Sequence, residues 1–257
     1  MVRTKTQERR RGAITRALDA AAEVDAPTYK ADQTGEIKQW DERDILFARR
    51  DLWRYFGQDT PQFRAYYDAH PEHLDYDAKL EHLPELGRTG GVDAAIFDAQ
   101  FEAIAEIAPE SFVDGEPAPR QAEIPPERAS SKVKGIACIL GADLVRIGLL
   151  RQEWVYSHTG RSFGDKDGFR RRGSPIDLRH HSNAVALGFR MDRDLIRTAP
   201  DFPTLVATAQ GYAMGAWVAV QLAGYIRLMG FSARAHHLYN DQVLAVPVAV
   251  DCGLGEL

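Results

Sequence analysis

The last residues of the sequence hold the densest group of side chains that could do chemistry. Two adjacent histidines, His236 and His237, precede Asn240 and Asp241 in the segment ARAHHLYNDQVLAVPVAVDCGLGEL. Side chains of neighbouring residues on an extended chain point in opposite directions, so these two imidazoles cannot readily bind one ion. The adjacent pair at 180–181 has the same geometry, and no strong example of a metal-binding spacing occurs. We therefore predict no metal ion held by protein side chains.

Asn240 and Asp241 fit two roles that can coexist. Either residue could cap a helix over the following QVLAVPVAV, with Asp241 the better candidate for the cap. The Asn240 amide could instead face a ligand from the same turn. A helix N-terminus beside a cavity would also favour anionic groups of that ligand.

A second chemical group lies on a long apolar segment that carries no charged residue from position 203 to position 226. Pro203 near its start and Gly230 at its end predict one long helix. Its length alone would allow a membrane span, but the glutamines, threonines and glycines within it favour a helix buried in a protein core.

This predicted helix carries two stripes of interest. Small residues recur at every fourth position and form a flat ridge, which suits close packing or contact with a flat ligand: Gly211, Gly215, Ala219 and Ala223. Thr208 and Tyr212 are also four residues apart and share a neighbouring face. A hydroxyl and a phenol on an apolar helix need partners or face a cavity.

The elements around these groups predict an α/β domain over residues 129–257. A helix ending at Gly141 precedes a strand, NAVALGFRM is a second strand, and FSARAHHL reads as a third. The order helix, strand, strand, helix, strand implies at least partly parallel pairing. Residues 1–36 read as a basic arm with a helix at AITRALDAAAEV, and residues 37–128 as a helical region ending in a proline-rich strap.

Composition excludes several classes of protein. The 257 residues carry a net charge of −5, which gives no electrostatic footprint for nucleic acid. The two cysteines, Cys138 and Cys252, lie outside any CxxC, so this chain holds no iron–sulfur cluster of its own. A reducing compartment or a disulfide would both fit them. The basic first twelve residues lack the apolar region of a signal peptide, so we expect a cytoplasmic protein.

Familiar catalytic motifs are missing from the sequence: it contains no GxGxxG, P-loop, GxSxG or HExxH. Longer segments nevertheless resemble one family. LGADLVRIGLLRQEWVYSH, NAVALGFRMDRDLIRTAPDF and ATAQGYAMGAWVAVQLAGYIRLMGFSARAHHLYND, in this order, are similar to the corrinoid-dependent reductive dehalogenases. The resemblance implies a flavin-reductase-like, cobalamin-binding domain with a mixed sheet flanked by helices, preceded by a mainly helical region. It also implies cobalamin bound base-off, with its nucleotide base detached from cobalt.

The resemblance assigns roles to individual residues. The proton donor of the family falls on Tyr212, the residue that lines the substrate cavity on Thr208, and the pocket asparagine on Asn240. A phenol is protonated at neutral pH and can donate to carbon as the halide leaves. The segment that would contact the corrin or its nucleotide tail comprises His236, His237, Leu238, Tyr239, Asn240 and Asp241. Neither histidine is expected to bind cobalt.

The family also implies parts that this sequence lacks. Two [4Fe-4S] clusters and an active-site arginine would follow GLGEL, so we expect a chain that ends before the iron–sulfur module. The implied partners are a small halogenated organic substrate and an electron donor such as a ferredoxin, a flavodoxin or a reductase module. A membrane would be met only through an anchor partner, in an exported respiratory form.

Two alternatives remain open at this point. Epoxyqueuosine reductases share the corrinoid domain, but they would be expected to show a basic surface for RNA, and this chain is acidic. A non-catalytic corrinoid-binding protein could keep the fold without the clusters, although Tyr212 and Asn240 would then have no catalytic use.

Overall fold

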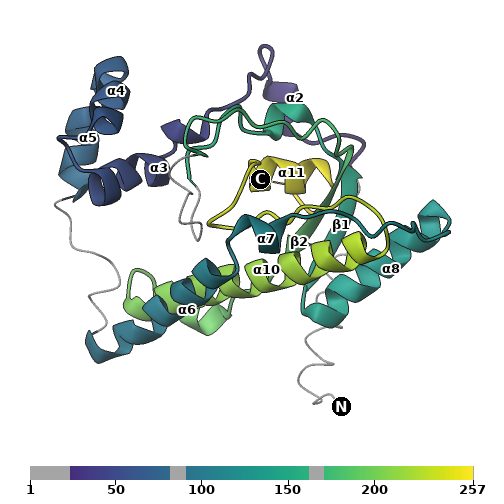
Figure 1. Ribbon diagram of the computed structural model, residues 1–257. Helices are drawn as coiled ribbons and strands as arrows, with labels where there is room; N and C mark the ends of the chain where they lie inside the picture. Colours follow the sequence, from purple (N-terminus) through teal and green to yellow (C-terminus); the bar gives the residue numbers. More distant parts are fainter. Residues whose placement is uncertain (1–23, 82–90, 162–170, 257) are drawn as a thin grey trace.

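The computed structural model describes residues 24–81, 91–161 and 171–256 (Figure 1). Helices dominate, and two strands form a small sheet. The elements in chain order are α2 (Tyr29–Asp32), η1 (Glu42–Asp44), α3 (Leu46–Asp51), η2 (Leu52–Phe56), α4 (Pro61–Ala69), α5 (Pro71–Glu81), α6 (Ala94–Glu106), α7 (Glu110–Val113), α8 (Pro126–Leu140), β1 (Leu144–Leu149), η4 (Gln152–Trp154), β2 (Asn183–Gly188), α9 (Arg193–Ile196), α10 (Phe202–Leu228) and α11 (Ala245–Asp251).

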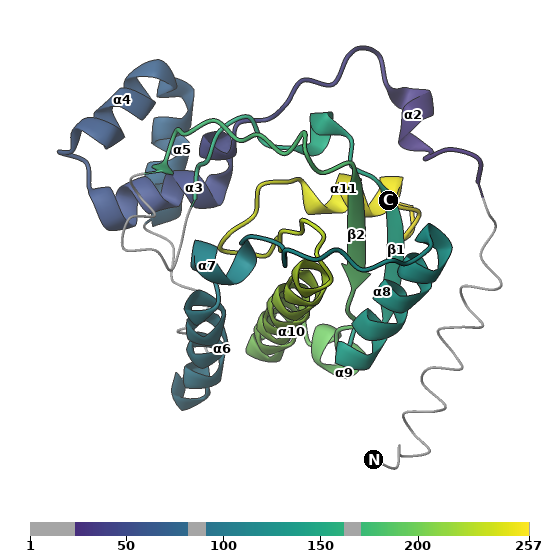
Figure 2. The ribbon, with the colours of Figure 1, turned by 45° about the vertical axis from the view of Figure 1, so that its right-hand side comes forward.

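Strands β1 and β2 pair antiparallel, from Leu144 opposite Gly188 to Leu149 opposite Asn183. Because side chains alternate along a strand, the sheet has two apolar faces. One face packs against α8 and α10 through a cluster that includes Val145. The other face packs against α11 through Ala186 and neighbouring apolar residues. Figure 2 shows the two strands between α11 on one side and α8 with α10 on the other.

Helix α10 is the central element of the molecule, and α6 runs beside it in both views (Figures 1 and 2). The ridge of small residues lets neighbours approach closely. A side chain added at Gly215 would meet the ring of Phe189 at 3.7 Å, and Ala223 is buried with Val113 and Ala235. In the described residues this ridge therefore serves packing of α10 against its neighbours.

The proline-rich segment after α7 runs along the C-terminal end of α10. The N–H groups of Ala118 and Ala122 donate to the carbonyls of Arg227 and Met229. Gly230 follows α10 with φ of +84°, a conformation that glycine adopts without steric cost. Its backbone lies so close to Gln121 that a Cβ atom would approach the Gln121 Cα to 2.5 Å.

A second helical lobe is built from α3, η2, α4 and α5, to one side of the sheet (Figure 1). Its core is aromatic and holds Leu52, Phe63, Tyr66 and Tyr67. The fully buried Asp77 accepts hydrogen bonds from Arg49 at 2.7 Å and from Tyr67 at 2.9 Å. A buried carboxylate with such partners ties α5 to α3 and α4.

Several sequence-based predictions of elements are confirmed. Helix α8 ends at Gly141, which has φ of +126°, and the predicted strands correspond to β1 and β2. Pro203 lies in the first turn of α10, and Gly230 follows its end. Among the described residues, no helix is both long and apolar enough to cross a membrane. The helix predicted at AITRALDAAAEV lies almost wholly outside the described residues.

Other predictions were wrong. FSARAHHL forms no strand, so the described sheet is an antiparallel pair without the parallel pairing that we expected. The nearest backbone partner of this segment is the end of α7, where the Ala235 N–H donates to the Val113 carbonyl at 2.7 Å. Asp241 does not cap α11 either, because that helix begins four residues later and Leu244 occupies its N-cap.

Candidate functional site

Helix α10 presents Tyr212 at the surface, with 44% of the residue exposed. The ring of Phe101, on α6, lies beside it, with 6.3 Å between the ring centres. The same Phe101 ring lies 6.2 Å from the ring of Tyr239, in the segment after α10. Phe101 therefore contacts both tyrosines, which the sequence analysis assigned to different parts of one site.

Thr208 lies one turn before Tyr212 on α10 and is half-buried. Its hydroxyl donates to the carbonyl of Thr204 at 2.9 Å, a bond within the helix that leaves the hydroxyl oxygen able to accept. A cavity of about 490 Å³ opens on another face of α10, lined by Gln210, Gly211 and Met214 together with residues after β2. Neither Thr208 nor Tyr212 lines this cavity.

Asn240 is buried and fully engaged in hydrogen bonds. Its side-chain N–H donates to the carbonyl of Ala108 at 2.8 Å and to the Glu110 carboxylate at 3.2 Å, while its oxygen accepts from Arg234. No hydrogen bond to Tyr212 is among those found in the described part of the chain. In this structure Asn240 fixes the backbone between α6 and α7 against the segment after α10.

Arg234 is the charge at the centre of this arrangement. Its side chain is 2% exposed and forms ion pairs with Glu110 and, at 3.1 Å, with Asp114. Arg171 adds a second cation 3.0 Å from Glu110. Burial opposes ionisation of Glu110, but the hydrogen bond and charge of Arg234 outweigh it and lower the pKa of that carboxyl to about 2.

The sequence analysis did not identify the pair formed by Arg234 and Glu110. The one local signal is a cation between two alanines in the ARAHH segment. Its partner lies 124 residues earlier in the chain, beyond the reach of local patterns.

The two adjacent histidines have separate environments, as their spacing predicted. The Gln242 N–H donates to Nδ1 of His236 at 3.2 Å, and burial with nearby Arg234 lowers the pKa of His236 to about 3. His237 donates through Nε2 to the carbonyl of Ile107 at 3.3 Å, because a carbonyl can only accept. Burial also lowers the pKa of His237. Both rings are therefore neutral at pH 7.

The remaining residues of the segment are partly buried and lie between cations. Burial raises the pKa of Asp241 to about 7, against the opposing charges of Arg161 and Arg234. The guanidinium of Arg161 lies 5.6 Å from the ring centre of Tyr239. Leu238 is half-buried beside them.

Two buried polar atoms, one in this segment and one two residues before it, test whether the residues fit a ligand. Within the described residues, Nδ1 of His237 and Nε of Arg234 are buried without a hydrogen-bond partner. One is an acceptor and the other a donor, and buried groups of this kind normally have partners. A corrinoid, with its peripheral amides and nucleotide phosphate, offers both kinds of partner, so the residues fit such a ligand.

Comparison with known proteins identifies the relatives of this chain. The tetrachloroethene reductive dehalogenase of Dehalobacter restrictus is 28% identical over 159 residues, which cover 51% of this chain and 28% of the relative. The enzyme of the same name from Desulfitobacterium hafniense matches with the same identity and coverage. The homologues are reductive dehalogenases. No family model matches the chain.

Solved reductive dehalogenases share the fold. The catabolic reductive dehalogenase NpRdhA superposes with a TM-score of 0.65 at 19% identity, over 93% of this chain and 30% of its own. Its complex with 3-bromo-4-hydroxybenzoic acid gives a TM-score of 0.63. A further reductive dehalogenase structure, described as suggesting a mechanism for B12-dependent dehalogenation, gives 0.62. The chain thus spans under a third of these dehalogenases, and the predicted resemblance is confirmed.

Proposed function

We propose that this chain is the corrinoid-binding and proton-donating part of a cobalamin-dependent reductive dehalogenase. The observation that carries the proposal is the fold shared with reductive dehalogenases over 93% of the chain. The overall reaction would replace a carbon–halogen bond by a carbon–hydrogen bond, consuming two electrons and one proton and releasing halide.

The segment from His236 to Asp241 would hold the cofactor in its base-off form. Cobalamin, when bound and reduced, supplies the cobalt chemistry that breaks the carbon–halogen bond. The unsatisfied Nδ1 of His237 would accept from a cofactor amide, and Nε of Arg234 would donate to an oxygen. The neutral His236 and His237 would add no charge beside the macrocycle.

Tyr212 would donate the proton. Its exposed position on α10 leaves the phenol accessible, with the ring of Phe101 beside it. Thr208, one turn earlier, would line the substrate cavity with a hydroxyl oxygen that can still accept a hydrogen bond.

Asn240 would act by positioning. Its amide would hold the segment from His236 to Asp241 in place through the hydrogen bonds with Ala108 and Arg234.

Electrons would come from two [4Fe-4S] clusters outside this chain, reduced by a ferredoxin, a flavodoxin or a reductase module. The described cysteines, Cys138 and Cys252, are separate free thiols in the structure. Iron–sulfur clusters need several cysteines together, which supports placing the clusters elsewhere.

The test of cofactor binding uses the full-length protein reconstituted with cobalamin. We expect one cobalamin per chain, with an electron paramagnetic resonance spectrum of the cobalt(II) form that lacks splitting from an axial nitrogen. His237→Phe should weaken cobalamin binding about tenfold, by analogy with the loss of outer-shell partners at metal sites. His180→Phe, on an exposed histidine, is the matched control. A wild-type protein that retains no cobalamin would overturn the proposal.

The substrate class is tested by halide release. Tetrachloroethene and 3-bromo-4-hydroxybenzoic acid, the compounds associated with the relatives, serve as alkene and aromatic probes. Release of chloride or bromide that requires both cobalamin and a reductant would support the proposed function. If the cobalamin-loaded protein releases halide from neither probe, the result would favour a non-catalytic corrinoid-binding role.

A further inference from the structure

Arg161 is a cation that joins the helical lobe to the segment from His236 to Asp241. Its Nε atom lies 3.3 Å from an oxygen of Asp51, on α3, and the two side chains are almost wholly buried, with 10% and 6% exposed. The same guanidinium lies over the ring of Phe47, also on α3, and over the ring of Tyr239, at 5.3 Å and 5.6 Å from the ring centres. One side chain therefore contacts two elements that are far apart in the sequence.

The backbone at Arg161 is itself fixed to the lobe. The N–H groups of Gly160 and Arg161 donate to one oxygen of the buried Glu42 carboxylate, in η1, at 2.6 Å and 3.1 Å. Arg172 donates to the carbonyls of Gly160 and Ala48 at 2.7 Å and 3.0 Å. The approach is so close that a Cβ atom at position 160 would lie 2.4 Å from the carbonyl carbon of Glu42. These contacts hold the start of the Arg161 side chain against η1 and α3.

Helix α3 then orients the guanidinium. Phe47 and Asp51 are four residues apart and lie on one face of the helix. Asp51 accepts from the edge of the guanidinium, and Phe47 lies beneath its charge. A planar guanidinium can make both contacts at once, whereas a lysine ammonium is a compact charge without a plane to stack. The lobe thus determines where the cation meets Tyr239.

The segment has two separate anchors as a result. On the side of α7, Asn240 donates to the Ala108 carbonyl and accepts from Arg234. On the side of the lobe, the contact comes from Arg161 through the ring of Tyr239. The charge of Arg161 also lowers the pKa of Tyr239, against the larger effect of burial, which raises it.

We propose that Arg161 is a positioning residue that holds Tyr239, and with it the segment from His236 to Asp241, against the helical lobe. The inference rests on the function proposed above, in which this segment contacts cobalamin. With Arg161 in place, the cofactor meets a segment that is already ordered. Without it, cofactor binding has to order the segment, which weakens the affinity.

The first test needs no cobalamin and measures hydrogen exchange in the full chain. Arg161→Met keeps the length of the side chain and removes its charge. We expect the N–H of Asn240, which donates to the His237 carbonyl at 2.8 Å, to exchange at least about threefold faster than in wild type. Because this variant leaves Asp51 buried without its cation, it is also made together with Asp51→Asn, and the same faster exchange is expected.

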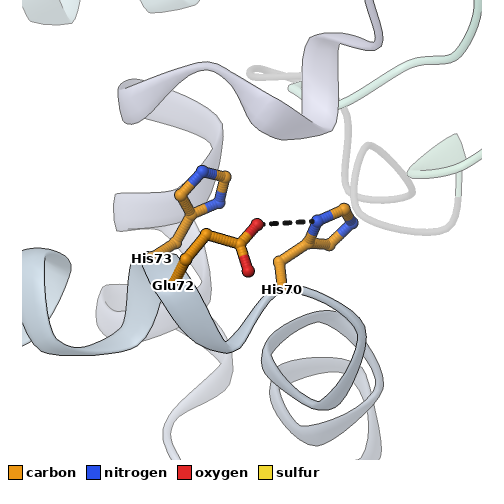
Figure 3. Close-up of side chains that lie close together, drawn as sticks. All are labelled: His70, Glu72 and His73. Atoms are coloured by element: carbon orange, nitrogen blue, oxygen red, sulfur yellow. Dashed lines mark ion pairs between the residues drawn. The ribbon is translucent and has the colours of Figure 1, made fainter.

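Two controls remove ion pairs of the same lobe. Arg50→Met breaks the pair with Glu81, at 3.2 Å. Glu72→Gln breaks the pair with His70 at the corner between α4 and α5 (Figure 3). Both should leave the exchange of Asn240 unchanged. Equal exchange in wild type and in both Arg161→Met proteins, or faster exchange in the controls as well, would overturn the proposal.

The second test measures cobalamin affinity in the full-length protein. Arg161→Met and Tyr239→Leu should each weaken binding about tenfold, the order of a desolvated cation–π contact, while Arg161→Lys should lose about threefold and Tyr239→Phe less than about twofold. The double variant Arg161→Met/Tyr239→Leu should bind no more weakly than either single variant, because the two residues act as one unit. Losses that multiply in the double variant would contradict the proposal. Wild-type protein that binds no cobalamin would contradict the proposed function instead, and the exchange measurement would still decide the role of Arg161.

Discussion

Single residues of the segment after α10 are held by charge and burial together. Arg234 is almost wholly enclosed, and its contacts with Glu110 and Asn240 join the start of α7 to the cofactor segment. Next to this cation, His236 is kept neutral, because burial and the positive charge of Arg234 both disfavour a second proton. His236 therefore makes the free energy of unfolding depend on pH.

His236 should make the protein sensitive to mild acid. Its pKa is about 3 in the folded protein and near 6.5 in the unfolded chain, so only the unfolded state takes up a proton as the pH falls below 6.5. The free energy of unfolding then falls by at most about 1.4 kcal/mol per pH unit. His236→Asn keeps an acceptor for the Gln242 N–H and should flatten this dependence between pH 6.5 and 4.5.

Urea unfolding measured at several pH values checks this prediction. His180→Asn provides the control, since it removes an exposed histidine and should keep the slope of the wild type. If the free energy of unfolding falls with pH by the same amount in His236→Asn and in wild type, another group is responsible for the pH dependence.

At the scale of elements, α10 and its two neighbours set the framework of the site. The strap over residues 114–124 crosses the end of α10 at Gly230, where backbone atoms from both segments are in contact. Helix α6 supplies Phe101, whose ring contacts both Tyr212 and Tyr239. The strap thus packs on the C-terminal end of α10, and α6 packs beside Tyr212.

Two glycine substitutions test this framework. Gly230→Ala forces a Cβ into a left-handed backbone position 2.5 Å from the Gln121 Cα, and should destabilise the protein by roughly 2–4 kcal/mol. Gly135→Ala, in the exposed interior of α8 with nothing within 4 Å of the new atom, should stabilise it by roughly 0.5–1 kcal/mol. The midpoint of thermal unfolding should fall for Gly230→Ala and rise for Gly135→Ala. Equal shifts of the midpoint in the two variants would contradict the close contact between the strap and α10.

Sequence patterns predicted the elements whose boundaries depend on neighbouring residues in the chain. The helix stop at Gly141, the start of α10 at Pro203 and the strands β1 and β2 all follow from residues within one or two turns. The third strand failed because an extended segment needs a partner strand, and FSARAHHL instead meets α7 through Ala235. No pattern within the segment specifies that partner.

The same limit applies to the site. The resemblance placed Tyr212 and Asn240, but the role of Asn240 in the structure depends on Ala108 and Glu110, more than a hundred residues earlier. Asp241 fits the local rules for a helix cap, yet α11 begins at Ala245 with Leu244 as its N-cap, and burial raises the pKa of Asp241 to about 7 against the charges of Arg161 and Arg234. Contacts of high sequence separation therefore decide the hydrogen bonds of Asn240.

At the scale of the whole molecule, the chain combines a helical lobe with a small sheet covered by helices on both faces (Figure 2). Reductive dehalogenases share this arrangement over 93% of the chain, although the chain spans only 30% of their length. The residues proposed for cofactor contact and proton donation lie close together within this shared part. The iron–sulfur clusters proposed to deliver electrons lie outside this chain.

The central claim is that Tyr212 gives its proton to the dehalogenated carbon. The most direct measurement compares wild type and Tyr212→Phe in the full-length, cobalamin-loaded protein, using halide release under reducing conditions on the probe with the higher turnover. We predict equal cobalamin content and a turnover lowered by roughly 10²–10⁴-fold, the usual contribution of a general acid. Unchanged turnover at equal cobalamin content would contradict the account.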